Sequence, residues 1–234
     1  ATRGIAPYKT VVTHGFIVDG EGRKMSKSIG NTVNPLDVAQ KNGIEILRLW
    51  TATSDFTEDL RISDEILKAN VESYRRLRNT FRYLLGALDG YSEDENVPLE
   101  DMPGLERWVL HRLTEVDEAI RKAFNAYDFQ AAFKVLVNFT NVDLSAVYFD
   151  IRKDSLYCDA PDSLRRRANR TVMDELFNCL TAWFAPIMVF TTEEAWRLRF
   201  PDAGSVHLRQ FPDVPSDWRN DKLAEKWAKI FKVR

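Results

Sequence analysis

The sequence contains few of the residues that bind metal ions or form disulfide bonds. Its 234 residues include only two cysteines and three histidines. Cys158 and Cys179 form no C-x-x-C motif, and the histidines lie far apart. These spacings exclude a zinc knuckle and a disulfide framework. We therefore predict no metal site and a reducing, cytoplasmic setting.

Long apolar runs and a strong net charge are also missing. No apolar run reaches the roughly 20 residues that a membrane-spanning helix needs, so we expect no membrane partner. The formal net charge is -2 at pH 7, so overall charge does not by itself indicate binding to nucleic acid. Arginines nevertheless cluster in "YRRLRNTFR" (74–82) and "RRRANR" (165–170). Basic segments of this kind are candidates for contact with RNA phosphates.

Beyond residue 60, apolar residues recur at three- and four-residue steps, which is typical of long amphipathic helices. The steps predict four long helices, over residues 63–88, 105–124, 129–148 and 164–183. Asp128 is a candidate cap for the third helix and Asp162 or Ser163 for the fourth, which should stop or kink at Pro186. Long helices with short connections predict an antiparallel bundle.

The end of the chain has weaker patterns. "TTEEAWRLRF" (191–200) predicts a helix that begins with a capping box, because threonine is followed by glutamate. "SVHLRQFP" (205–212) predicts a short extended piece, and "DKLAEKWAKIFKVR" (221–234) a helix. Aromatic residues at helical spacing are expected in the core: Trp108, Trp183, Trp196, Phe133 and Phe139.

Residues 1–60 are different in character. "YKTVVTHGF" (8–16) is rich in β-branched residues and predicts a strand. "NPLDVAQKNG" predicts a short helix with Asn34 as its cap and Gly43 as its stop, and "IEILRLWTAT" (44–53) a second one. The predicted fold class is therefore mainly α: an antiparallel helical bundle over 61–234, preceded by a small α/β segment over 1–60.

Between the predicted strand and the first helix lies a cationic loop, "GRKMSKSIGN" (22–31), which we name the KMSKS loop. Ammonium groups are compact charges on flexible stems, and hydroxyls donate to anionic oxygens, so a polyphosphate is the expected ligand. The spacing is neither that of a Walker loop nor that of a dinucleotide fingerprint. The alternative is a solvated surface loop, in which lysine and serine are common.

The five residues "KMSKS" match the signature of class I aminoacyl-tRNA synthetases, in which this loop precedes a helical domain that grips tRNA. The segment "THGFIVDGEGRKMSKSIGNTVNPLDV" resembles the branch specific for large aliphatic amino acids. Longer helical segments resemble bacterial-type isoleucyl-tRNA synthetases: "SDEILKANVESYRRLRNTFRYLL", "YDFQAAFKVLVNF" and "YFDIRKDSLY". The resemblance covers essentially the whole chain.

The resemblance implies that Lys24 and Lys27 are catalytic and stabilise the phosphates of ATP, which the parent enzyme uses with Mg. It implies that the ATP-binding residues are Lys24, Met25, Ser26, Lys27 and Ser28. The other ATP signature of the family, an HIGH-like tetrapeptide, is absent, because His14-Gly15 does not match it. We therefore expect an excised fragment that binds isoleucine only through the missing catalytic part. Alone, the fragment should not form isoleucyl-adenylate, and its KMSKS loop should be mobile.

The resemblance also implies that residues 61–234 form an anticodon-binding domain, truncated at the C-terminus, which binds the inner limb and anticodon of tRNA(Ile). Polar and basic residues of the predicted helices are the candidates for tRNA binding: Arg75, Arg76, Arg78, Asn79, Arg82, Arg152, Lys153, Arg165 and Arg166. The alternative for each is a solvated helix face paired with acids. We expect a monomer.

Three alternatives remain open. The first is a valyl-, leucyl- or methionyl-tRNA synthetase fragment, since KMSKS identifies the class and not the amino acid. The second is a non-catalytic RNA-binding helical module, and the third is a structural helical bundle. The KMSKS loop argues against the last two, because neither needs a loop that binds ATP.

Overall fold

The computed structural model describes residues 4–233. The chain divides into two compact units, one reaching to Val71 and the other starting at Glu72, so the boundary falls inside helix α3 (Asp64–Ala87). Among the described residues, no helix is both long enough and apolar enough to cross a membrane.

The first unit contains a short parallel strand pair and two helices. β1 (Ile17–Val18) pairs with β2 (Leu60–Arg61), and α1 (Pro35–Asn42) and α2 (Ile44–Thr53) lie between them in the sequence. Both predicted helices are confirmed, and α1 has the predicted cap and stop. The Asn34 side chain accepts from the backbone N–H of Leu36, and Gly43 at the end of α1 has a φ of 86°. The side chain of Trp50 anchors α2, because its indole N–H donates to the carbonyl of Arg61 at 2.9 Å.

The predicted strand over residues 8–16 is wrong. Regular strand structure begins only at Ile17. The backbone N–H of Gly15 donates to the carbonyl of Phe56 at 2.9 Å, and that of Phe16 to the Asp59 carboxylate at 2.8 Å. Such isolated bonds do not make a ladder, and β-branched composition forms a strand only where a partner strand continues the pairing.

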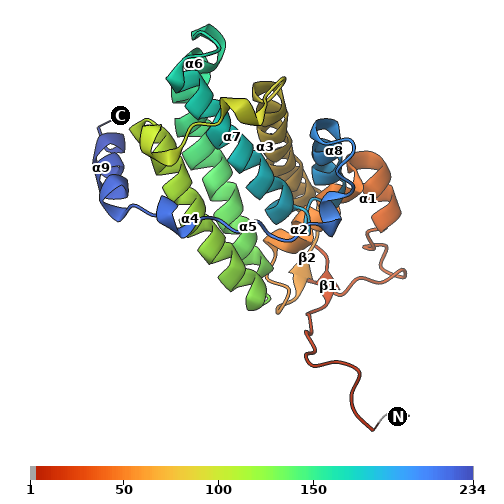
Figure 1. Ribbon diagram of the computed structural model, residues 1–234. Coiled ribbons are helices and arrows are strands. Elements are labelled where there is room, and N and C mark those ends of the chain that lie inside the picture. The colour runs from red at the N-terminus through yellow and green to blue at the C-terminus, as the bar shows by residue number, and fades with distance from the viewer. Residues whose placement is uncertain (1–3, 234) are drawn as a thin grey trace. The chain divides into compact units, whose positions relative to one another are not determined.

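The second unit is an antiparallel bundle of long helices (Figure 1). Its helices are the greater part of α3, α4 (Gly104–Asn125), α5 (Phe129–Asn138), η3 (Phe139–Phe149), α6 (Asp150–Cys158), α7 (Leu164–Phe184), α8 (Val189–Arg199) and α9 (Asp221–Phe231). Single 3-10 turns lie in the connections: η1 (Glu93–Glu95), η2 (Leu99–Asp101), η4 (Val206–Leu208) and η5 (Ser216–Trp218). The four predicted long helices and the predicted C-terminal helix are confirmed.

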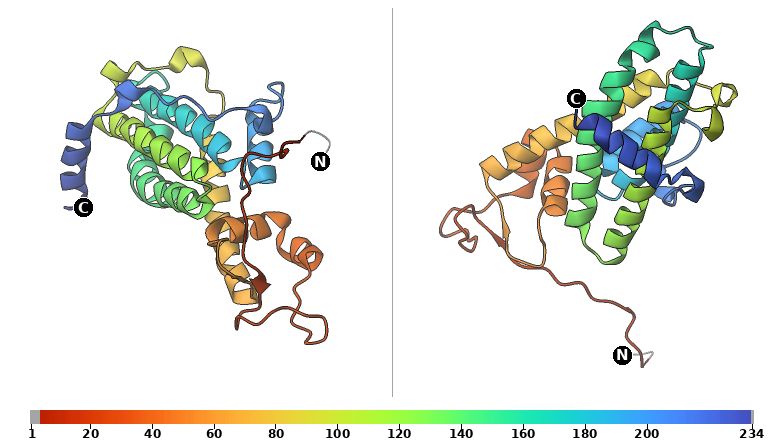
Figure 2. Two further views of the ribbon diagram at one scale, coloured as in Figure 1. Left: turned by 90° about the horizontal axis from the view of Figure 1, so that it is seen from below. Right: turned by 90° about the vertical axis from the view of Figure 1, so that its left-hand side faces the viewer.

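The third predicted helix continues beyond its expected end and changes its winding. α5, η3 and α6 follow one another without interruption and form one continuous helix, seen from two sides in Figure 2. Its middle part, η3, is π-helical over 11 residues, whereas the flanking parts are α-helical. π-Helical turns are rare and frequently occur at functional sites, so the surface around η3 is a candidate functional region.

The predicted caps set the reversals between the helices. The Asp128 side chain accepts from the backbone N–H of Ala131, and Tyr127 before it has a φ of 58°. Ser163, one of the two candidates for α7, accepts from the backbone N–H of Arg166. α7 ends at Phe184, two residues before Pro186, as the proline predicts.

Aromatic side chains form the core of the second unit. Its largest fully buried side chains include Trp183, Tyr148, Phe139, Phe177 and Phe184. The ring of Phe184 packs edge-on against the rings of Phe81 and Phe133, at centroid distances of 6.0 and 6.3 Å. The five aromatic residues predicted for the core are all buried, so that prediction is confirmed.

Two predictions near the C-terminus are wrong. α8 begins at Val189, so Thr191 and Thr192 lie inside the helix instead of capping it. The Thr192 hydroxyl bonds back to the carbonyl of Met188, because the preceding turn already forms the N-terminus of the helix. Residues 206–208 form the turn η4 and not an extended piece, because the Ser205 side chain accepts from the backbone N–H of His207.

Candidate functional site

The KMSKS loop is folded around the carboxylate of Asp19. One oxygen of Asp19 accepts from the backbone N–H groups of Arg23 at 2.8 Å and Glu21 at 3.0 Å. The other accepts from the Arg23 guanidinium and the Asn31 side-chain amide, both at 2.9 Å. These hydrogen bonds hold the pKa of Asp19 well below its usual range, and the bond from Asn31 has the largest effect. An ionised Asp19 therefore ties the beginning of the loop to its end.

Asn31 is the second anchor of the loop. Its side-chain oxygen accepts from the backbone N–H of Ser26 at 2.9 Å, and its amide donates to the carbonyl of Lys24 at 3.3 Å. The hydroxyls of Ser26 and Ser28 bond to each other at 2.9 Å. Gly30 closes the turn with a φ of 73°, a conformation that L side chains rarely adopt. The loop thus holds its shape through bonds that leave its lysine side chains unused.

The two lysines of the loop are exposed, and neither has an ion-pair partner among residues 4–233. Arg23 differs, because it pairs with Asp19 at 2.9 Å and Glu21 at 3.2 Å. Within the loop, Lys24 and Lys27 are therefore the cations whose charge no acid of the described residues neutralises. In the part of the chain that is described, no cluster of His, Cys, Asp or Glu could hold a metal ion.

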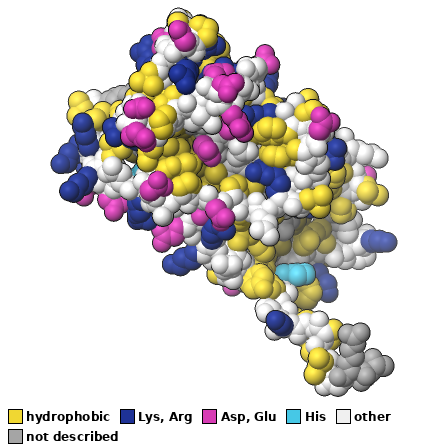
Figure 3. Space-filling view, in the orientation of Figure 1, with side chains coloured by type: hydrophobic (Ala, Val, Ile, Leu, Met, Phe, Trp, Pro, Cys, Tyr) yellow, Lys and Arg dark blue, Asp and Glu magenta, His cyan; other side chains and the backbone are white. Residues whose placement is uncertain are grey.

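Most of the predicted tRNA-binding arginines have partners within the protein. Arg78 makes a two-pronged pair with Glu194 at 2.8 and 3.0 Å, which raises the pKa of Arg78. Arg75 pairs with Glu72 at 2.8 Å. Of the other predicted residues, Arg165 pairs with Asp159, Lys153 pairs with Asp150, and Arg166 donates to the carbonyl of Leu156. Acidic and basic side chains are accordingly interspersed over the face of this unit in Figure 3.

Arg152 has the most enclosed partner. Its guanidinium donates two hydrogen bonds to Glu106, at 2.5 and 2.6 Å. The Glu106 side chain is 0% exposed and that of Arg152 only 13%. Burial raises the pKa of Glu106 even though Arg152 acts in the opposite direction. This pair connects α4 to α6 inside the bundle.

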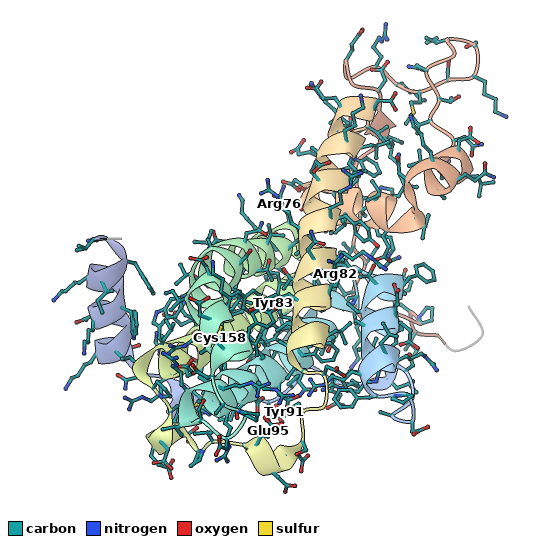
Figure 4. All side chains as sticks on the ribbon, turned by 90° about the horizontal axis from the view of Figure 1, so that it is seen from above. Arg76, Arg82, Tyr83, Tyr91, Glu95 and Cys158 are labelled. Atoms are coloured by element: carbon teal, nitrogen blue, oxygen red, sulfur yellow. The ribbon has the colours of Figure 1, made fainter. Side chains whose placement is uncertain are left out.

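Arg76, Asn79 and Arg82 form the remaining group of predicted contact residues, and all three are exposed on α3. Within residues 4–233, neither Arg76 nor Arg82 forms an ion pair. They lie on different sides of the helix (Figure 4): Arg82 borders a hollow against α8, whereas Arg76 faces η3.

A groove of about 560 Å³ lies between α3 and η3, and we name it the α3–η3 groove. Its lining residues are Arg76, Asn79, Thr80, Tyr83, Asn141, Ser145, Phe149, Asp150 and Lys153. It brings together three residues that sequence reasoning selected, Arg76, Asn79 and Lys153, and several that it missed. The spacing 76, 79, 80 and 83 marks one face of a helix and could have indicated Tyr83. No local signal relates Asn141 or Ser145 to α3.

Comparisons with known proteins agree with this arrangement. Residues 1–63 match the class I tRNA synthetases for I, L, M and V, and residues 106–234 match the anticodon-binding domain of tRNA ligase. The isoleucine--tRNA ligase of Mesorhizobium japonicum is 56% identical over 233 residues, and that of Agrobacterium fabrum 55% over 234. Each alignment covers 100% of this chain but only 23% and 24% of the relative, so the chain spans about a quarter of their length.

Solved structures share the fold at lower identity. LeuRS of Agrobacterium radiobacter K84, in a ternary complex with tRNA and LeuAMS, has a TM-score of 0.69 at 19% identity, over 88% of this chain and 24% of that one. Methionyl-tRNA synthetase of Mycobacterium tuberculosis, in complex with methionyl-adenylate, has a TM-score of 0.64 at 24% identity, over 79% of this chain and 37% of that one. The resemblance to isoleucyl-tRNA synthetases is confirmed, and the chain belongs to the class I tRNA synthetases, with an anticodon-binding domain of tRNA ligase as its larger part.

Proposed function

We propose that this chain is part of an isoleucine--tRNA ligase, which activates isoleucine with ATP and transfers it to tRNA(Ile) in the cytoplasm. The proposal rests on the order of two features along the chain. A loop with two unpaired lysines comes first, and an anticodon-binding domain follows it. Relatives with 55–56% identity that are isoleucine--tRNA ligases favour isoleucine over valine, leucine or methionine.

In this proposal the KMSKS loop acts on ATP. Negative charge grows on the pyrophosphate leaving group while the isoleucine carboxylate attacks the α-phosphate. Lys27 and Lys24 stabilise that charge, and cations at this position act in the transition state more than in the ground state. Ser26 and Ser28 hold the loop's shape through their mutual hydrogen bond. Mg accompanies the ATP in the complete enzyme, which also supplies the isoleucine pocket.

The helical unit binds tRNA(Ile) as a monomer in this proposal. Arg76 and Arg82 are the first candidates for phosphate contact, because no acid among the described residues pairs with either. Arg75, Arg78 and Arg165 are exposed, and an exposed ion pair is worth so little that a phosphate can replace its acid. Contact through Arg152 would require breaking a buried pair, which makes it the weakest of the proposed contacts.

Titration of the 234-residue chain with tRNA transcripts tests the second half of the proposal. Affinity should be highest for an isoleucine acceptor and should fall steeply with salt, because phosphate contacts release counterions. Equal affinity for valine and methionine acceptors would contradict the isoleucine assignment. Absence of binding to every tRNA at low salt would contradict the role in RNA binding.

Substitution in the full-length enzyme tests the first half. Lys27→Ala should lower the rate of isoleucine-dependent ATP–pyrophosphate exchange by roughly 10²–10³-fold, the range for loss of one transition-state donor, with tRNA affinity nearly unchanged. Lys41→Ala is the matched control, since Lys41 is an exposed lysine of α1 outside the loop. Equal loss in the two variants would contradict a specific role for Lys27. The 234-residue chain alone should show no exchange.

A further inference from the structure

The α3–η3 groove contains polar groups that the protein leaves without partners. The hydroxyl oxygen of Tyr83 is buried and has no hydrogen-bond partner among the described residues. The side chains of Asn79, Asn141 and Ser145 line the same groove, and the described part of the chain supplies no hydrogen bond to any of the three. Two amides and two hydroxyls of the groove thus lack a partner within the described residues.

The floor of the groove is aromatic. The rings of Tyr83 and Phe149 pack against each other at a centroid distance of 4.4 Å, and both residues line the groove. Arg76 lies one helical turn from Asn79 and two from Tyr83 on the same face of α3, and has no acid partner within residues 4–233. Figure 4 shows Arg76 and Tyr83 on the side of α3 that faces the α5–η3–α6 helix.

We propose that the α3–η3 groove binds one unpaired nucleotide of an RNA strand, with the base against the amides and the aromatic floor and the adjoining phosphate at Arg76. This inference rests on the proposed function, because it assigns a site for tRNA within the helical unit. The volume of about 560 Å³ lies within the range of small-ligand sites and leaves room for a nucleotide.

The lining fits an unpaired base better than other ligands. An amide presents a donor and an acceptor side by side, which matches the edge of an unstacked base, and proteins read RNA sequence mainly through such bases. A free phosphate would need several cations, but Lys153 is already paired with Asp150 at 3.0 Å. A duplex keeps the Watson–Crick edges of its bases paired, so these edges could not bond to the amides. An apolar peptide helix has apolar side chains that would also offer the amides no partner.

Substitution of Tyr83 can distinguish a role of its hydroxyl in RNA binding from a role in the stability of the protein. A buried hydroxyl without a partner destabilises the free protein, so Tyr83→Phe should leave the melting temperature unchanged or raise it. Burial raises the pKa of Tyr83 to about 12, so the hydroxyl stays protonated and can donate at neutral pH. A variant that retains stability but loses RNA affinity has lost a contact to RNA and not a contact within the core.

The first experiment measures affinity for an unmodified transcript of an isoleucine acceptor. Tyr83→Phe and Asn141→Ala should each weaken binding by roughly three- to tenfold, the equivalent of one hydrogen bond. Asn138→Ala is the matched control, because Asn138 is an exposed asparagine on the same continuous helix that does not line the groove. Unchanged affinity in both groove variants would overturn the inference.

The second experiment places a thiol in the groove. In a Cys158→Ser background, Ser145→Cys introduces a thiol in the groove, and Ala146→Cys introduces one at the next residue, which is exposed and outside it. The tRNA should slow alkylation at position 145 at least several-fold and leave position 146 unaffected. A blunt RNA duplex should protect neither position, because it contains no unpaired base.

The outcomes separate the two proposals. Binding of tRNA without protection at position 145, or equal protection by the duplex, would overturn the groove assignment and leave the proposed function intact. Failure of every tRNA to bind would overturn the role in RNA binding, and the groove assignment with it. Loss of affinity in the groove variants together with selective protection at position 145 would support both.

Discussion

Replacement of Arg152 by methionine should destabilise the helical unit strongly, although the sequence placed Arg152 among candidate RNA contacts. Its two hydrogen bonds to Glu106 are 2.5 and 2.6 Å long, and the Glu106 side chain is 0% exposed. Arg152→Met would leave a buried carboxylate without its cation, which costs about 3–5 kcal/mol of unfolding free energy. For a unit of this size, each kcal/mol lowers the melting temperature by about 2–4 °C, so we expect a drop of roughly 6–20 °C.

A matched control separates burial from pairing. Arg165 also makes two hydrogen bonds to a carboxylate, at 2.5 and 2.7 Å to Asp159, but its side chain is 55% exposed. Arg165→Met should therefore lower the melting temperature far less than Arg152→Met, because water screens an exposed ion pair. Thermal unfolding followed by circular dichroism compares the two variants directly. Equal effects would refute the reasoning, because they would show that enclosure of the pair does not determine its contribution.

The acid dependence of Arg152→Met gives a second check. Burial raises the pKa of Glu106 already in the intact pair, and loss of the arginine should raise it further. The folded state then binds a proton that the unfolded chain releases above its ordinary glutamate pKa of about 4.3. The variant should therefore regain stability as the pH falls from 7 towards that value. Glu106→Gln combined with Arg152→Met should regain part of the loss at pH 7 as well. A deficit independent of pH would contradict the buried-charge explanation.

Three further predictions concern other parts of the chain. Asp19→Asn should disorder the KMSKS loop at neutral pH, seen as altered amide chemical shifts of loop residues; since the pKa of Asp19 is lowered in the folded loop, the wild type should show this change only below about pH 4, and an acid-insensitive loop would contradict it. In the native chain a thiol reagent should modify only Cys158, because Cys179 is buried and burial raises its pKa; two fast-reacting thiols would contradict this. Gly15→Ala should cost about 1–3 kcal/mol and increase proteolysis of the first unit, because its methyl group would overlap the carbonyl of Glu58; unchanged resistance would contradict this.

Local features were predictable because the sequence within one or two turns determines them. The helices follow from apolar periodicity, and the Asn34, Asp128 and Ser163 caps bond to backbone groups two or three residues away. The predicted strand over residues 8–16 failed for the complementary reason, since a strand depends on a partner that composition does not specify.

The ion-pair partners of the arginines could not be predicted from the local sequence pattern. That pattern predicts Arg78 and Arg152 as cations on a solvated helix face, but their acidic partners lie 116 and 46 residues away in the sequence. The α3–η3 groove has the same origin: Tyr83 and Asn141 become neighbours only through the packing of α3 on η3. Only the bundle shows which cations are already neutralised and which polar groups lack partners.

The π-helical winding of η3 makes the length of that helix a constraint in its own right. A π turn closes five residues apart instead of four, so this winding accommodates more residues per turn than an α-helix. Side chains four apart, such as Asn141, Ser145 and Phe149, therefore line up more nearly in a row. If the winding stayed unchanged, deletion of one residue here would rotate α6 by roughly 100° relative to α5. Arg152 would then turn away from Glu106. A change in the number of residues in η3 should therefore be tolerated less well than a substitution of one of them.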